Sequence, residues 1–192
     1  MLLKELVELN PSKYLWAVRA IVYKMRFGGF GNLSYIGKPI SLENVKRVEI
    51  RRKVRIYPGA RIETHGDGRI LIENNVSIGQ NFHITSCGSS LVIGKDTTIL
   101  GNVFVTNIDH DYREIGVHIL KQEYLTKETR IGQNCFIGFG AAIQAGTILG
   151  NQCIVGANSV VRGEFPDYSV IVGAPAKVVK RYNFETGEWQ KV

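Results

Sequence analysis

The sequence predicts an all-β fold in which very short parallel strands wind into a three-sided β-helix. Through residues 131–161 an aliphatic residue recurs at every sixth position, and glycine directly follows four of these residues. The same six-residue spacing runs through residues 50–105, where the aliphatic residues fall in groups of three. A period of six fits neither the 3.6-residue period of an α-helix nor the two-residue alternation of a long strand. Each hexad is therefore interpreted as a short strand and a turn, with one apolar side chain pointing inward.

Three hexads close one coil, and the pattern predicts about five coils. Stacked at the spacing of paired strands, five coils make a prism about 24 Å tall with aliphatic ladders as its core. Short insertions, THGDG and CGSS, are expected at corners before the second and third groups. The predicted inward residues are Ile50, Ile56, Ile62, Ile72, Ile78, Ile84, Ile93, Ile99, Val105, Ile131, Ile137, Ile143, Leu149, Val155 and Val161.

Appendages flank the repeat. Residues 1–30 are predicted to form an amphipathic helix and a glycine-rich joint, residues 31–175 the β-helix, and residues 176–192 a short tail. Asn10 and Pro11 make a favourable helix start. This basic helix could lie on an anionic membrane, or pack on its own protein or a neighbouring subunit. Its apolar face is predicted to comprise Tyr14, Leu15, Val18, Ile21, Val22 and Met25.

The repeat is interrupted once by a long insertion. The segment TNIDHDYREIGVHILKQEYLTKETRIG, residues 106–132, holds two of the four histidines, and the hexads resume directly after it. Loops of this length without structure of their own are usually functional or disordered. We therefore expect functional groups at the edge of the insertion, which spans about residues 111–130.

The composition favours a cytoplasmic protein with an anionic partner. The chain has 192 residues, 24 Lys and Arg against 17 Asp and Glu, and a formal charge of +7. This charge suits a nucleotide, a phosphorylated carrier or an acidic membrane surface. Cys87, Cys135 and Cys153 form no Cys-x-x-Cys pair and are expected to be reduced, packed thiols. No signal sequence or membrane-spanning run is recognised.

The hexads and the closing segment IVGANSVVRGEFPDYSVIVGAPAKVVKR resemble the hexapeptide-repeat acyltransferases, whose fold is a left-handed parallel β-helix. Within that family, NIDHDY, IGQNCFIGFGAAIQAG and the tail KRYNFETGEW resemble the sugar O-acetyltransferases of lipopolysaccharide and capsule assembly, a branch similar to galactoside and maltose acetyltransferases. The resemblance covers about residues 30–190. It implies transfer of an acetyl group from acetyl-CoA to a sugar hydroxyl, with no metal required.

His110 is the predicted general base. Direct transfer from a thioester to a hydroxyl requires adjacent substrates, a base for the hydroxyl proton, and donors facing the developing oxyanion. An imidazole, with an ordinary pKa of about 6.5, can serve as that base. His110 lies at the edge of the insertion and occupies the position of the catalytic histidine in the resembled family. Asp109, Asp111 or a backbone carbonyl could orient its ring.

Three residues near this base are candidates for acceptor binding. His83 and His110 share the outward phase of their hexads. Both could therefore face one cleft, with His83 either contacting the sugar or simply exposed to solvent. Asp109 adjoins the base. Tyr112 stands where many members of the resembled family have a second histidine, and is interpreted as shaping the acceptor pocket.

The resemblance places coenzyme A on the last coils and the tail. Its amides suit backbone groups and its phosphates suit cations. Arg162 and Gly163 replace the Thr-Lys or Ser-Lys pair usual in the family. Backbone contacts are expected from Phe139 and Ala157, the path of the pantetheine arm is expected along Arg162 and Gly163, and phosphate contacts are expected from Lys177 and Lys180.

The resemblance also implies a homotrimer with active sites between subunits, in which the long insertion reaches the neighbouring subunit. The expected partners are acetyl-CoA and a saccharide, without nucleic acid. An N-acetyltransferase acting on an amino sugar is the alternative within the same fold. A γ-type carbonic anhydrase would need closer histidine pairing. An ice-binding prism would need flat threonine arrays, which the insertion interrupts.

Overall fold

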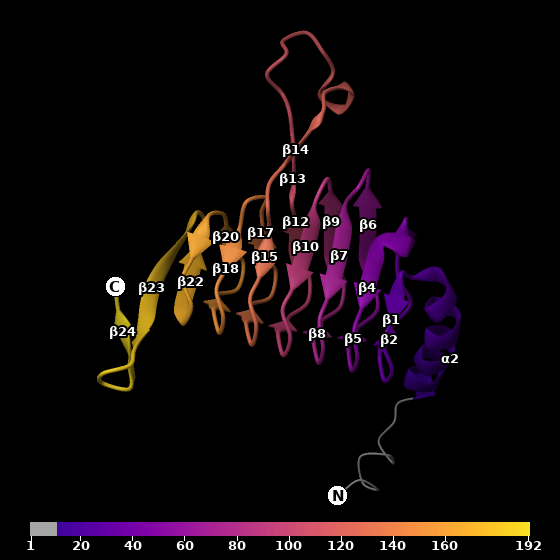
Figure 1. Cartoon of the computed structure of the whole chain (residues 1–192). Coiled ribbons are helices and arrows are strands. Elements are labelled where there is room, and N and C mark those ends of the chain that lie inside the picture. The colour runs from indigo at the N-terminus through magenta and orange to yellow at the C-terminus, as the bar shows by residue number, and fades with distance from the viewer. Residues whose placement is uncertain (1–10) are drawn as a thin grey trace, which may run out of the picture.

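A computed structural model describes residues 11–192. Three parallel sheets surround one apolar core and form a prism of six complete coils, followed by part of a seventh (Figure 1). Each coil passes through the first, second and third sheets in turn. The predicted all-β repeat fold with an N-terminal helix is confirmed.

Most strands are only two to five residues long, as the period of six requires. The first sheet contains β1 (Gly29–Phe30), β4 (Val48–Ile50), β7 (Arg69–Ile72), β10 (Ser90–Ile93), β15 (Arg130–Ile131), β18 (Ile148–Leu149) and β21 (Glu164–Phe165). The second contains β2 (Tyr35–Ile36), β5 (Arg55–Ile56), β8 (Ser77–Ile78), β11 (Thr98–Ile99), β16 (Phe136–Ile137), β19 (Ile154–Val155) and β22 (Ser169–Gly173). The third contains β3 (Ser41–Glu43), β6 (Arg61–His65), β9 (His83–Cys87), β12 (Phe104–Thr106), β17 (Ala142–Ile143) and β20 (Val160–Val161).

The core consists of the aliphatic ladders that the hexads predicted. Every predicted inward residue from Ile50 to Val161 is at most 2% exposed. Each fully buried aliphatic side chain contributes about 1.5–3 kcal/mol relative to exposure. The glycine that follows many of them is required by the close stacking of coils, since a Cβ at Gly132 would lie 2.3 Å from the carbonyl oxygen of Gly150.

The prism has one more coil than the pattern indicated, and it is the first. Phe30, Ile36 and Leu42 stack in register on Ile50, Ile56 and Ile62. The strand β1 begins at Gly29, inside the segment interpreted as a joint. The glycines of FGGFGN are needed there because a Cβ at Gly28 or Gly31 would collide with backbone of the next coil.

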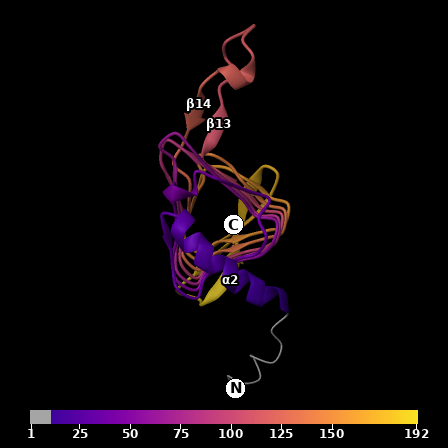
Figure 2. The ribbon, with the colours of Figure 1, turned by 90° about the vertical axis from the view of Figure 1, so that its right-hand side faces the viewer.

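Helix α2 (Pro11–Arg26) lies across the N-terminal end of the prism (Figure 2). The side of the helix that packs on the prism is not the predicted aliphatic stripe. Trp16 stacks against Tyr35 and Tyr57, and Tyr23 against Phe30, because aromatic rings fill the open end of the first coil better than the aliphatic stripe does. The predicted apolar residues are exposed instead: Leu15, Val18, Ile21, Val22 and Met25. Asn10 and the side chain of Tyr14 lie outside the described part.

A hairpin closes the opposite end. The strands β23 (Ala176–Asn183) and β24 (Glu188–Lys191) continue the second sheet in antiparallel fashion after β22. The segment predicted as a short tail is therefore the outermost layer of the prism at its C-terminal end (Figure 1).

Candidate active site

The long insertion forms a hairpin arm that projects from the flank of the prism (Figures 1 and 2). Its strands β13 (Ile108–His110) and β14 (Tyr124–Thr126) pair in antiparallel fashion, with His110 opposite Tyr124. A 3-10 turn, η2 (Ile119–Lys121), begins after His118, whose Nδ1 accepts a hydrogen bond from the backbone of Leu120 at 3.2 Å. The other 3-10 turn, η1 (Val45–Arg47), belongs to a corner of the prism.

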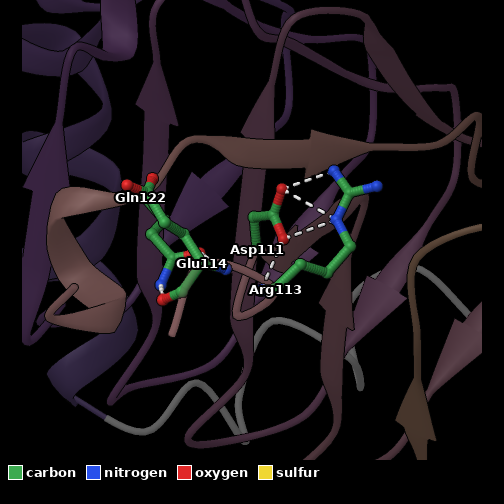
Figure 3. A network of polar contacts seen from close by, with 4 residues as sticks. All are labelled: Asp111, Arg113, Glu114 and Gln122. Carbon is green, nitrogen blue, oxygen red and sulfur yellow. Dashed lines mark hydrogen bonds and ion pairs between the residues drawn. The ribbon is translucent and has the colours of Figure 1, made fainter. Parts of the chain in front are cut away.

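Polar contacts within the arm hold its outer loop (Figure 3). Arg113 Nε donates to Asp111 Oδ1 at 2.8 Å, and these bonds hold the pKa of Asp111 far below its ordinary value. The Gln122 side chain accepts from Glu114 N at 3.1 Å and donates to Glu114 O at 3.2 Å. The loop is therefore ordered by its own hydrogen bonds rather than by the prism.

Asn107, which no sequence motif indicated, fastens the first residues of the arm to the prism. This fully buried side chain accepts from Cys87 N at 2.9 Å and donates to Cys87 O at 3.0 Å. It also donates to Ser89 Oγ at 3.0 Å. A buried amide with all these bonds formed fixes the direction in which β13, and therefore His110, leaves the third sheet.

A cleft of about 380 Å³ lies between the arm and the outward face of the third sheet. On that face the outward residues of paired strands form rows, such as Arg61 beside His83 and His83 beside Phe104. His83 and His110, which the sequence suggested could share a cleft, both line this one. The lining comprises Arg61, Glu63, His65, His83, Thr85, Phe104, Thr106, Ile108, Asp109, His110, Tyr124 and Gln144.

His110 is exposed at the mouth of this cleft and its ring packs edge-on against Tyr124, with ring centroids 5.1 Å apart. In the part of the chain that the structure describes, neither of the carboxylates proposed to orient the ring is hydrogen-bonded to His110. Asp109 forms an ion pair with Arg162, and Asp111 binds Arg113, because on an extended strand these carboxylates point away from their neighbour's imidazole. The aromatic contact with Tyr124 limits the orientations that the His110 ring can adopt.

A buried carboxylate, Glu63, also lines the cleft. Glu63 is 2% exposed and accepts from Arg61 Nε at 2.6 Å and from Ser41 Oγ at 3.0 Å. Burial by itself raises the pKa of Glu63, but these hydrogen bonds outweigh it and lower the pKa. Beside this pair, burial and the Arg61 charge lower the pKa of His83, whose Nε2 is buried without a protein partner. His83 is therefore neutral and holds an unused hydrogen-bonding atom.

Tyr112 and most of the predicted coenzyme residues lie outside this cleft. Tyr112 is 71% exposed on the arm. Arg162 does reach the cleft through its pair with Asp109. The corner residues Phe139 and Ala157 are adjacent, and Phe139 O accepts from Asn158 N at 2.8 Å. Gly163 follows β20, and Lys177 and Lys180 lie on β23.

The cysteines are placed as packing residues. Cys135 and Cys153 are buried in successive coils, and their thiols donate to Gly150 O and Pro166 O, both at 3.2 Å. The contact with Cys153 and burial raise the pKa of Cys135, and burial raises the pKa of Cys87. In Cys135 and Cys87 the raised pKa disfavours the thiolate that a nucleophile needs. The contact with Cys135 lowers the pKa of Cys153, but that thiol is fully buried.

Among the described residues there is neither a candidate metal cluster nor a helix suited to crossing a membrane. Over residues 11–192, no three His, Cys, Asp or Glu side chains are grouped so that they could hold a metal ion. Within the same range, no helix has the length and apolar character needed to cross a membrane.

Comparison with known proteins agrees with the repeat. Residues 128–163 match the family described as bacterial transferase hexapeptide (six repeats). The chain is 32% identical over 198 residues, the full length of both proteins, to WbbJ of Escherichia coli strain K12, which is named as a lipopolysaccharide biosynthesis O-acetyl transferase. It is 31% identical over 149 residues to Rv3034c of Mycobacterium tuberculosis, named as an acetyltransferase, covering 76% of this chain and 49% of that protein.

Solved structures show the same fold. AntD, an N-acyltransferase from Bacillus cereus in complex with dTDP and 3-hydroxybutyryl-CoA, superposes with a TM-score of 0.74 at 18% identity, over 88% of this chain and 90% of that chain. A galactoside acetyltransferase in complex with coenzyme A gives 0.61 at 21% identity, over 93% and 76%. The predicted left-handed β-helix and the predicted acyltransferase activity are confirmed. The chain belongs to the bacterial hexapeptide-repeat transferases.

Proposed function

We propose that the protein is an O-acetyltransferase that moves an acetyl group from acetyl-CoA to a sugar hydroxyl during synthesis of bacterial surface polysaccharide, either lipopolysaccharide O-antigen or capsule. The observation that carries this proposal is the full-length similarity to WbbJ. The cleft supports it, because His110 lines the cleft and provides the single base that the reaction needs.

The reaction proceeds by direct transfer. His110 removes the proton of the sugar hydroxyl while the hydroxyl oxygen attacks the thioester carbonyl carbon. The tetrahedral intermediate then collapses, its carbon–sulfur bond breaks, and the imidazolium returns the proton to the departing thiolate. No covalent acyl-enzyme is formed, in keeping with the burial of Cys135 and Cys153.

The acceptor is held by the outward face of the third sheet. His83 is neutral and its Nε2 has no protein partner, so it can exchange a hydrogen bond with a sugar hydroxyl. Asp109 lines the same cleft and is held by Arg162. This ion pair joins the base of the arm to the coil on which the pantetheine arm of the donor is expected.

The donor site is completed in a homotrimer. In one chain Phe139, Ala157, Gly163, Lys177 and Lys180 lie apart from the cleft of His110, so we propose that coenzyme A runs between subunits. The arm supports this arrangement, because Ile115 and Leu120 near its tip are 93% and 73% exposed and would be covered by a neighbour. Tyr112 would then approach an acceptor from the arm.

We place the reaction in the cytoplasm, at the inner face of the bacterial membrane where surface polysaccharide precursors would be modified. The buried free thiols of Cys135 and Cys153 suit a reducing compartment.

The test has two parts. Purified protein is incubated with acetyl-CoA and saccharide acceptors, and release of the coenzyme A thiol is followed together with the product mass. Alkaline hydroxylamine then distinguishes the bond formed, because it cleaves an acetyl ester and leaves an acetyl amide. In parallel, surface polysaccharide from a deletion strain is analysed by mass spectrometry. A hydroxylamine-stable acetyl group would favour the amino-sugar alternative, and polysaccharide with unchanged acetylation would refute the proposal.

A further inference from the structure

Helix α2 has a second apolar face that the described part of the chain leaves uncovered. Its inner side packs on the first coil through Trp16, Ala20 and Tyr23. The outer side consists of aliphatic residues that are 48–70% exposed, namely Leu15, Val18, Ile21, Val22 and Met25. A contiguous aliphatic stripe of this length facing water marks an interaction surface.

The first coil extends this apolar surface at a strained position. Leu33 is 74% exposed with a φ of 62°. A left-handed backbone disfavours leucine by about 1–2 kcal/mol. Leu33 and Ile21 line one groove of about 350 Å³ between helix and coil. At the equivalent left-handed position the next five coils have polar residues, namely Lys53, Asn75, Asp96, Asn134 and Gln152.

The positive charge of the protein is concentrated at the same end. Residues 11–61, which form α2 and most of the first two coils, contain twelve Lys and Arg but two acidic residues. Residues 62–192, which form the remainder of the prism and the arm, contain eleven Lys and Arg and thirteen acidic residues. Arg26 and Lys24 border the stripe on the helix, and Arg51, Arg52 and Lys53 are exposed on the adjacent corner of the second coil.

We propose that this end of the prism docks on an anionic membrane surface. The docking face comprises the outer stripe of α2, Leu33 and the surrounding cations. Its aliphatic side chains would enter the boundary between headgroups and acyl chains, while Arg and Lys meet lipid phosphates. The excess of cations over acids favours an anionic lipid surface as the occupant, since two copies of this positively charged end would repel each other.

The geometry leaves the active site free in this orientation. Helix α2 crosses the end of the prism, so its outer side faces along the prism axis, whereas the arm projects from the flank (Figures 1 and 2). Docking therefore requires neither acetyl-CoA nor an acceptor. Membrane binding and acetyl transfer are independent properties that separate assays can measure.

The experiment is flotation of the full-length protein with vesicles of phosphatidylcholine, alone or mixed with phosphatidylglycerol. We expect binding to the mixed vesicles and release as salt rises, because exposed charges are screened. The double variant Val22→Gln, Met25→Gln should bind about tenfold more weakly, since two aliphatic side chains are lost from the boundary. Leu33→Asn, which introduces the residue type used at this corner in later coils, should also weaken binding. Val192→Gln is the control, because Val192 is 78% exposed at the opposite end.

Several outcomes would overturn the proposal. Equal binding to both kinds of vesicle would exclude a role for the cations, and wild-type binding by the double variant would exclude the stripe. Light scattering adds a further criterion: if the wild type ignores vesicles and the double variant dissociates its oligomer, the face belongs to a second copy of the chain. Coenzyme A release with a water-soluble acceptor should stay unchanged in all these variants, so a failure of docking would leave the proposed reaction untouched.

Discussion

Two corners of the same coils differ sharply. The corner between the first and second sheets has four residues in each of the six complete coils, and its third residue is always left-handed, from Leu33 to Gln152. The corner between the third and first sheets varies from two residues after β9 to the whole of residues 107–129 after β12.

The difference shows where this fold accepts insertions. β10 pairs with β15 across the arm in the same register that joins uninterrupted coils, with Ile93 beside Ile131. An excursion between paired strands therefore leaves the core ladder intact, since loop closure costs only about 0.6 kcal/mol for each doubling of length. The uniform corner maintains the stack, and the variable corner carries the candidate active site.

The largest expected effect tests whether the chemistry resides on the arm. His110→Ala should lower kcat by on the order of a hundredfold or more, because the hydroxyl proton loses its acceptor. The folded state and acetyl-CoA binding should persist. The matched control is His118→Ala on the same arm, whose ring lies outside the cleft and which should keep activity. A wild-type rate in His110→Ala would show that His110 is not the general base.

The attachment of the arm is the next most sensitive feature. Asn107→Leu leaves the backbone N–H and C=O of Cys87 without their side-chain partners, which should cost about 1–3 kcal/mol in the free energy of unfolding. Turnover should fall because His110 is no longer held in position. Limited proteolysis should show faster cleavage within residues 111–123 while the prism stays resistant. If the arm is cut no faster than in the wild type, Asn107 is not its anchor.

The tail offers a test outside both corners. Lys177→Ala and Lys180→Ala should each raise KM for acetyl-CoA a few fold with little change in kcat, because phosphate contacts are equal in the ground and transition states. Lys191→Ala is the control, since Lys191 pairs with Lys180 on the neighbouring strand β24. An unaltered KM for acetyl-CoA in both variants would show that the coenzyme phosphates do not bind at β23.

The smallest expected effect concerns the cleft floor. The folded-state pKa of His83 lies below its ordinary value of 6.5, so the unfolded chain binds more protons just below pH 6.5. The free energy of unfolding should therefore fall as the pH drops through this window and recover above it. In His83→Gln this component should vanish, as measured by urea unfolding across pH. A pH profile identical to that of the wild type would show that burial does not penalise the His83 charge.

Much of the fold was predictable because a hexad is a local signal. Each inward aliphatic residue needs only its own coil, and the hexad phase predicted outward positions for His83 and His110, which both line the cleft. The same phase also marks Arg61, one residue before Ile62, as a neighbour of His83. The first coil was missed because its inward residues include Phe30, inside a glycine-rich segment typical of a joint.

The sequence by itself determined the repeat, the place of the interruption and the candidate general base His110, because these depend on the spacing of residues along the chain. Only the tertiary structure decided the partners of those groups. Arg162 binds Asp109 from a position 53 residues away, and Asn107 fastens the arm to a strand that ends 20 residues earlier. It also turned the aromatic side of α2 inward and left its aliphatic stripe exposed. Such contacts depend on which coils stack together. Stacking brings together side chains that are far apart in the sequence, and no local sequence pattern relates them.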